Sequence, residues 1–334
     1  MTEIIPGINQ LQIPMGITDN PTEYTNTYLV QGDGGYLLID PGMNTEEAFD
    51  SLKRGISEIG IGFEDITQIL ATHVHIDHYG LAGRVKQLSQ AKILLHHIER
   101  DLIQPMHTNI EERSRQSEQW LHINGVPSLE LSQIQMGARG MPRFTPTTIM
   151  PDITLNGGET ISTGVFNFQV LWTPGHSPGH ICLYEPTRKI LFTGDHILPV
   201  ITPNVSLQSQ SDLNPLGDFL NSLNIVKQLD VNLVLPAHEH AFTGLRTRVE
   251  EIIERHKQRS SEILEALKAE TKTAYQISTE ITWMPELGGV SFQNLAPLNK
   301  RMAISETLAH LEAMRVDGRV DKSSRDSIIY YRRT

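Results

Sequence analysis

ATHVHIDHYG, residues 71–80, holds three histidines and one aspartate within six positions. The stretch follows an apolar run that is typical of a buried strand. In an extended chain, residues i and i+2 project to the same side, so His73 and His75 can reach one cation. Asp77 and His78 come after a further step and can turn toward a second point. Four ligands in two pairs predict two metal ions rather than one, with the remaining ligands supplied by other segments.

Further ligand candidates come directly after later apolar runs. His176 lies between glycines and prolines after FQVLW, Asp195 follows ILFTG, and His238 follows NLVLP. Loops at the ends of strands are where α/β scaffolds usually place functional residues. A carboxylate such as Asp195 can also bridge two cations. With Cys182 as its single cysteine, the chain offers no thiolate cluster, so histidine and carboxylate must hold any metal.

The ordered set of motifs resembles the metallo-β-lactamase-fold hydrolases. THVHIDH matches the signature run of that family, PGHSPGH, GD and PAH match its later motifs, and NTYLV with LLIDPG matches its first strands. The resemblance covers about residues 1–245. It implies a fold of the α/β class, an αββα sandwich with a two-metal site at one edge.

The resemblance also implies a role for each candidate ligand. Carried over by position, the ligands of the first metal are His73, His75 and His176. The ligands of the second metal are Asp77, His78 and His238, with Asp195 bridging the two metals. The family usually has Gly-His-Gly at its last motif, whereas this chain has AHEH. His240 therefore stays an alternative to His238, which aligns with the family ligand.

The reaction that the resemblance implies is hydrolysis. Two cations about 3.5–4 Å apart would hold a hydroxide between them, because binding to zinc lowers the pKa of water to about 7. The hydroxide would attack an electrophilic carbonyl or phosphorus, and Asp77 would act in catalysis by accepting a hydrogen bond from it. Histidine and aspartate ligands suit zinc, with iron and manganese as alternatives.

Three other polar residues are candidates for supporting roles. His180 comes four residues after a predicted ligand and is expected to orient it, since metal-bound histidines need their second nitrogen held by a neighbour. Asp40, in LLIDPG, has two interpretations, as a similar support or as the cap of a turn. His196 is equally compatible with lining the pocket and with ordinary packing.

Apolar runs predict two β-rich blocks with helices between them. The expected strands are 26–30, 36–40, 68–72 and 92–96 in the first block, and 168–172, 181–185, 190–194 and 232–236 in the second. The expected helices are 45–58, 81–89 and 215–229. This alternation favours two sheets packed face to face and covered outside by helices.

Residues 98–150 interrupt this rhythm with a helical stretch and a proline-rich loop. Met106, Met136, Met141 and Met150 fall in this insertion into the catalytic domain 1–245. Because methionine adapts to irregular apolar shapes, a flexible lid is one interpretation. The other is a helix pair packed on the core.

Residues 246–334 form a second, smaller domain in this interpretation. A long amphipathic helix opens it, and further helices are expected at about 274–283 and 299–316. Two short strands around a polar turn at Lys322–Ser324 end the chain. Three helices followed by a β-hairpin are the outline of a winged helix.

The charge balance disfavours two classes of partner. The chain has 28 Lys and Arg against 39 Asp and Glu, a net charge of −11, which argues against general affinity for nucleic acid or anionic membranes. No stretch approaches 18 consecutive apolar residues, and MTEIIPGINQ has no basic and apolar signal pattern. We therefore expect a cytoplasmic protein.

The motifs leave the substrate open. A small-molecule thioester, ester or lactone is expected first, because the catalytic half is acidic and the insertion is apolar. The alternative is a single-strand-directed endoribonuclease whose winged helix contacts phosphates. Its candidate contacts are Lys300, Arg301, Lys322, Arg325, Arg332 and Arg333. A DNA-binding regulator without turnover ranks third. Because a winged helix can equally serve in dimerisation, a homodimer is a further expectation.

Overall fold

The computed structural model describes residues 1–16, 23–107, 110–140, 149–207, 214–268 and 270–334. The chain divides into two compact units. Unit 1 comprises Met1–His107, Arg143–Pro199 and Ile225–Arg248. Unit 2 comprises Thr108–Pro142, Val200–Asn224 and Val249–Thr334.

Within its described residues, unit 1 contains a first sheet of seven strands in chain order. These strands are β1 (Thr2–Ile5), β2 (Ile8–Pro14), β3 (Tyr24–Gly32), β4 (Gly35–Ile39), β5 (Ile66–Leu70), β6 (Lys92–His96) and β7 (Ile153–Leu155). Strands β1 to β4 are antiparallel, whereas β4 to β7 are parallel. The connecting helices are α1 (Glu46–Ile59), the 3-10 turn η1 (Phe63–Asp65), α2 (Ile76–Tyr79), α3 (Ala82–Ser89) and α4 (His97–His107).

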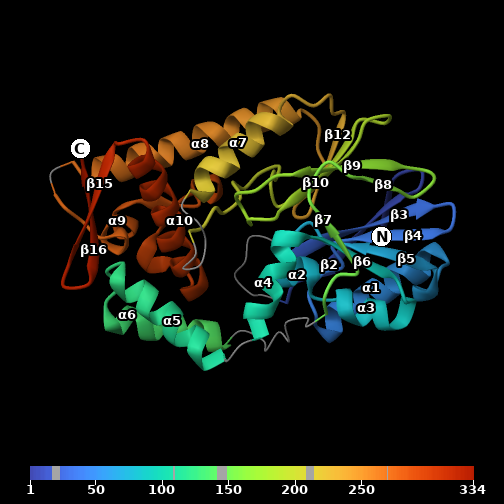
Figure 1. The fold of residues 1–334 in the computed structure, drawn as a ribbon, viewed down its shortest axis with the longest axis horizontal. Coiled ribbons are helices and arrows are strands. Elements are labelled where there is room, and N and C mark those ends of the chain that lie inside the picture. Colours follow the sequence, from blue (N-terminus) through green and yellow to red (C-terminus); the bar gives the residue numbers. More distant parts are fainter. Residues whose placement is uncertain (17–22, 108–109, 141–148, 208–213, 269) are drawn as a thin grey trace. The chain divides into compact units, whose positions relative to one another are not determined.

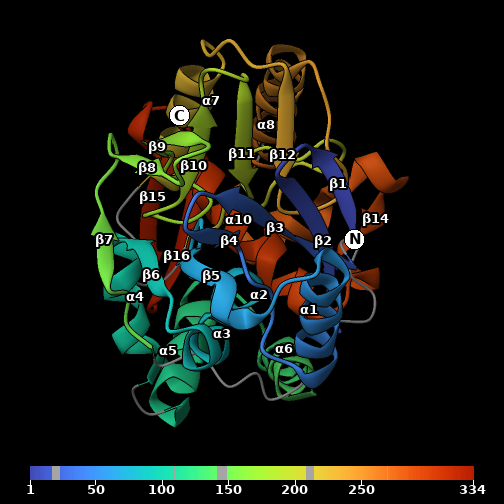
Figure 2. The ribbon, with the colours of Figure 1, turned by 90° about the vertical axis from the view of Figure 1, so that its right-hand side faces the viewer.

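The second sheet of unit 1 has the described strand order β12-β11-β10-β9-β8. Its strands are β8 (Thr160–Ser162), β9 (Asn167–Trp172), β10 (Ile181–Glu185), β11 (Ile190–Gly194) and β12 (Leu233–Pro236). Strands β11 and β12 are parallel and lie side by side in Figure 2, and the other pairs are antiparallel. Strands β9, β11 and β12 therefore run in one direction and end at the same edge of the sheet.

An apolar layer packs the two sheets face to face. Val30 of the first sheet shares a buried cluster with Phe168 and Leu183 of the second. Successive strand residues point to opposite faces, so Leu29 is buried on the other side of the first sheet, in a cluster with Leu52 of α1. Helices α1 and α3 cover that outer face (Figure 1). The sheet-on-sheet arrangement confirms the α/β sandwich that the sequence predicts.

Unit 2 is mainly helical. Its described elements are α5 (Ile110–Ile123), α6 (Ser128–Gly140), most of α7 (Pro215–Val226) and of α8 (Leu245–Ala266), α9 (Ala274–Glu280), α10 (Pro297–Val316), the 3-10 turns η2 (Pro285–Leu287) and η3 (Phe292–Asn294), and the strand pairs β13–β14 (Thr282–Trp283, Val290–Ser291) and β15–β16 (Val320–Arg325, Ile328–Arg333). One buried cluster joins Leu121 and Ile134 with Ile263, Ile277 and Leu308. The insertion helices and the C-terminal helices therefore share a core.

The final hairpin corrects one prediction. Lys322–Ser324 lies within β15 rather than in a turn, and the turn is formed by Asp326 and Ser327. Both turn residues have positive φ, 49° and 64°, as a tight two-residue hairpin requires. A polar, exposed strand does not show the apolar alternation by which strands are recognised. Three helices followed by a hairpin match the expected outline, but the assignment as a winged helix stays a prediction.

The insertion differs from its predicted form. Helix α6 extends through Gly140, into the segment expected to be a proline-rich loop, and residues 141–148 lie outside the described residues. The side chains of Met106, Met136 and Met141 also lie outside them, so the lid stays untested. The compact units are more interleaved than a single boundary after residue 245. No helix in the described ranges is long and apolar enough to cross a membrane.

One carboxylate ties the final hairpin to α10. Glu312, 3% exposed, accepts hydrogen bonds from Lys322 Nζ at 2.7 Å, Tyr331 OH at 2.8 Å and Arg315 Nε at 2.6 Å. Although burial opposes its charge, bonds from Lys322, Arg315 and Tyr331 lower the pKa of Glu312. Because the pKa of Glu312 is lower in the folded than in the unfolded state, its charge stabilises the fold at pH values above the unfolded pKa. This stabilisation is lost as the pH falls through the folded pKa.

Glu312→Gln should destabilise the protein by about 2–3 kcal/mol at pH 7, because hydrogen bonds to a charged acceptor are strong. The difference from the wild type should shrink below about pH 4.5. Urea unfolding at pH 7 and pH 3.5 measures both. Asp321→Asn, which breaks an exposed pair with Arg332 in the same hairpin, is the control and should cost under about 1 kcal/mol. Equal losses in both variants would contradict the assignment.

Candidate metal centre

Five of the candidate ligands lie in loops at the ends of strands, and Asp77 and His78 lie in the short helix α2. His73 and His75 follow β5, which ends with its parallel neighbours at one edge of the first sheet. His176, Asp195 and His238 follow β9, β11 and β12, which end at one edge of the second sheet. Loops from both sheets thus meet.

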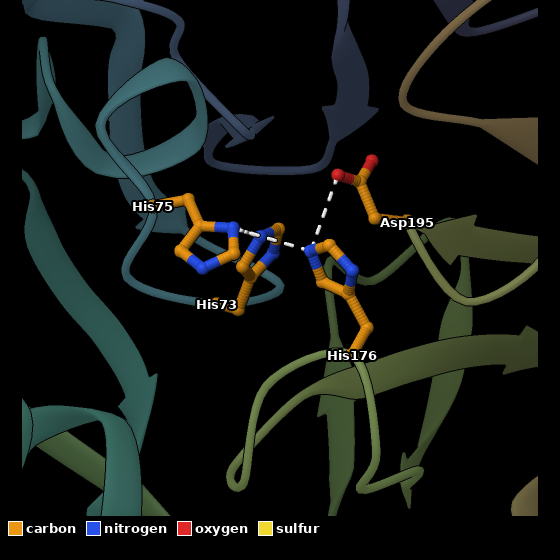
Figure 3. Close-up of side chains that lie close together, drawn as sticks. All are labelled: His73, His75, His176 and Asp195. Atoms are coloured by element: carbon orange, nitrogen blue, oxygen red, sulfur yellow. Dashed lines mark hydrogen bonds and ion pairs between the residues drawn. The ribbon is translucent and has the colours of Figure 1, made fainter. Parts of the chain in front are cut away.

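The first cluster consists of three imidazoles and one carboxylate. His75 Nδ1 lies 2.8 Å from His73 Nε2 and 3.1 Å from His176 Nε2. Asp195 Oδ2 lies 3.4 Å from His176 Nε2. Figure 3 shows the three rings converging, with Asp195 next to His176. All four residues offer ligand atoms within 4.8 Å of one another, which is compact enough for one cation.

A second cluster joins Asp77, His78 and His238. Asp77 Oδ2 lies 3.5 Å from His78 Nε2 and 3.4 Å from His238 Nε2. Asp195 also reaches this cluster, with Oδ2 3.4 Å from His78 Nε2 and Oδ1 3.4 Å from His238 Nε2. The carboxylate of Asp195 therefore lies between the two clusters. The structure brings together all seven residues singled out in the sequence.

Two buried atoms of these clusters make no hydrogen bond. They are His78 Nε2 and Asp195 Oδ1. A buried polar atom without a hydrogen bond is costly, and native structures nearly always satisfy it. A cation on each side of Asp195 would satisfy both atoms. The two His/Asp clusters are consistent with a dinuclear metal centre.

The first cluster is also electrostatically suited to a cation, whereas in the second cluster the carboxylates of Asp195 and Asp77 raise the pKa of His78 and of His238 against the effect of burial. Burial lowers the pKa of His73 well below its usual range, and burial together with the neighbouring His176 lowers the pKa of His75 to about 4. Both rings are then neutral, the form that binds metals. Although burial opposes its charge, His238 and His78 hold the pKa of Asp195 well below its usual range, so this carboxylate is ionised.

Asp40 supports both ligand pairs of the 73–78 segment. Its Oδ2 lies 3.0 Å from His78 Nδ1, and it accepts hydrogen bonds from Thr72 N at 2.7 Å and Thr72 Oγ1 at 2.9 Å. Thr72 Oγ1 in turn lies 3.1 Å from His73 Nδ1. Asp40 has a φ of 50°, a strained value for a residue other than glycine. Its contacts favour the supporting role over the turn cap.

Strand β3 fixes the loop of His238. Asn26 Nδ2 donates to the carbonyls of Pro236 and Glu239, both at 3.0 Å, and His238 Nδ1 lies 2.8 Å from the Tyr24 carbonyl. Asn26 was not singled out from the sequence. The available signal was a polar residue inside an apolar strand. His240 is exposed and belongs to neither cluster.

His180 holds the backbone of Asp195. Its Nε2 accepts a hydrogen bond from Asp195 N at 3.2 Å, and its Nδ1 lies 2.9 Å from Thr173 Oγ1. His180 thus hydrogen-bonds to the backbone of Asp195, and its ring also lies near that of His176, with centroids 6.1 Å apart. His196 packs its ring near His180, with centroids 5.9 Å apart. Cys182 is buried, as expected of a small apolar residue.

The chain is similar to known proteins over most of its length. It is 25% identical to a probable metallo-hydrolase, YqjP, of Bacillus subtilis over 91% of this chain and 92% of that protein. It is 26% identical to the human acyl-coenzyme A thioesterase MBLAC2 over 66% of this chain and 75% of that protein. A crystal structure of the metallo-beta-lactamase family protein TTHA1429 from Thermus thermophilus superposes with a TM-score of 0.81 at 30% identity, covering 99% of this chain and 100% of that one.

Residues 20–238 match the model of the metallo-beta-lactamase superfamily. The match spans the strand ends and both ligand clusters described above. The chain therefore belongs to the metallo-beta-lactamase superfamily and is a metallo-hydrolase of that fold.

Proposed function

We propose that this protein hydrolyses a small-molecule thioester, ester or lactone with the help of two divalent cations. The position of Asp195 between two His/Asp clusters carries the proposal. One cation would be held by His73, His75 and His176. The other would be held by Asp77, His78 and His238, with Asp195 shared by both.

The protein residues would orient the ligands and the attacking water. Two bound divalent cations supply Lewis acidity and lower the pKa of water toward neutrality. Asp77 is partly exposed, so its carboxylate can accept a hydrogen bond from the attacking water. Asp40 orients the ring of His78, Asn26 holds the loop of His238, and His180 holds the backbone of Asp195. Zinc fits the donor set, with iron and manganese as alternatives.

Two observations support a small acyl substrate. The similarity to an acyl-coenzyme A thioesterase extends over 66% of this chain. In addition, some of the lysine side chains that a nuclease would use to contact phosphates pair with carboxylates within unit 2. Lys300 pairs with Glu130 at 2.7 Å, and Lys322 pairs with Glu312 at 2.7 Å. The endoribonuclease therefore stays the second candidate, without a contact that favours it.

Protein purified without added metal or chelator should contain up to two transition-metal ions per chain. Removing them should lower the melting temperature by several degrees, since a ligand at 1,000 times its Kd stabilises by about 4 kcal/mol. Asp195→Asn should lose at least one equivalent. Elemental analysis and thermal unfolding measure this, with the exposed Asp50→Asn as control. A metal-free protein that chelators leave unchanged would refute the site.

Among acyl thioesters, carboxylic esters and lactones, at least one class should be turned over in a metal-dependent reaction. Asp195→Asn, purified in parallel, should lower kcat/KM by about 100-fold or more, since even partners outside the ligand set cost 10–100-fold. Steady-state assays on such a panel test the proposal. Metal-dependent cleavage of single-stranded RNA, with no acyl turnover, would instead favour the nuclease.

A further inference from the structure

The loop of His73 and His75 and the loop of His176 share a partner outside the ligand set. This partner is Glu99, in the first turn of α4, whose side chain is 0% exposed. The two loops are separated by about a hundred residues of sequence, so nothing local fixes their spacing. A residue that binds both loops can fix their spacing.

Glu99 accepts a hydrogen bond from each loop. Its Oε2 lies 2.9 Å from Val74 N, the backbone amide between His73 and His75. Its Oε1 lies 2.7 Å from Gly179 N and also accepts from Ser177 Oγ. One carboxylate therefore joins the segment of two ligands to that of the third.

The loop of His176 is shaped to receive this carboxylate. A Cβ added to Gly179 would lie 2.8 Å from Glu99 Cγ, closer than real side chains approach, so glycine is required for this contact. The same loop is also held by Trp172, whose Nε1 donates to the Pro178 carbonyl at 2.9 Å. Two side chains thus hold this loop, and the one that also binds the first loop is Glu99.

The donors also suit a carboxylate and no neutral side chain of the same shape. Two backbone N–H groups and a hydroxyl point at the two oxygens of Glu99. Burial raises the pKa of Glu99, and the bonds from Ser177, Val74 and Gly179 oppose that rise. A buried carboxylate costs free energy unless such donors satisfy it.

A backbone hydrogen bond also joins the same two segments on the far side of the ligands in sequence. Ile181 N donates to the Thr72 carbonyl at 3.0 Å.

We propose that Glu99 is a positioning residue that sets the spacing of the two loops and so preorganises His73, His75 and His176 for the first cation. In this role Glu99 acts through the backbone that carries the three ligands. The inference rests on the metal site of the proposed function, not on the choice of substrate.

Glu99→Gln is the sharpest test. The amide keeps the shape of the side chain, but its NH₂ group must face either Val74 N or Gly179 N, a donor against a donor. The Co²⁺ affinity of the first site should fall by about 10–100-fold, the usual cost of losing a partner that orients ligands. The visible absorption spectrum of that Co²⁺ should change as well. The affinity of the second site should change less.

Glu185→Gln is the matched control. Glu185 is equally buried, at 1% exposed, and accepts from Arg188 N in the β10–β11 hairpin, at the end of β10 opposite the loop of His176. Ser177→Ala is the milder companion, since it removes one donor and leaves Glu99 in place. It should weaken the first site by about fivefold, as expected for one net hydrogen bond.

Titration of the chelator-treated full chain with Co²⁺, followed by absorbance and calorimetry, separates the outcomes. Weaker binding and an altered spectrum in Glu99→Gln, with Glu185→Gln unchanged, would support the proposal. Wild-type affinity and spectrum in Glu99→Gln, or in Ser177→Ala if the glutamine variant does not fold, would overturn it. If the wild type binds two Co²⁺ but hydrolyses no acyl substrate, the substrate proposal fails and the role of Glu99 stands.

Discussion

The buried carboxylate of Asp195 carries the interaction on which the site depends. It lies 3.4 Å from imidazole nitrogens of His78 in α2 and of His176 and His238 in the loops after β9 and β12. Such a group costs free energy in a protein interior unless opposite charge accompanies it. The sandwich meets this demand by ending β5, β9, β11 and β12 where their loops converge. The ends of these strands therefore determine where the candidate metal ligands meet.

The strands and the ligand residues that follow them could be predicted from the sequence, for a physical reason. The strands of a two-sheet core are buried on both faces and read as short apolar runs. The residues that follow such runs fall at the sheet edge, and His73, His176, Asp195 and His238 do so. Their identities then determined which chemistry that edge could support. The predicted strands at 26–30 and 181–185 were recovered for the same reason.

The partners of the ligands were harder to foresee. Glu99 and Asn26 act on segments that lie far from them in sequence, and no spacing rule connects them. The exposed strand β15 carries alternating polar residues without an apolar face, so its turn was misplaced. The last turn of α6 was taken as a loop because it runs into a glycine- and proline-rich segment. Long-range pairing and solvent-facing strands leave little trace in local composition.

The interleaving of the two units has a consequence for synthesis of the chain. Leu131 and Ile134 of α6 are translated about 170 residues before Ile304 and Leu308, with which they share a core. At 5–20 residues per second, these apolar side chains wait about 10–35 s for their partners on the ribosome. Unit 1 can gather most of its strands meanwhile, whereas this core of unit 2 can close only after α10 has been translated. Apolar residues of nascent α6 therefore stay without these core partners for that time.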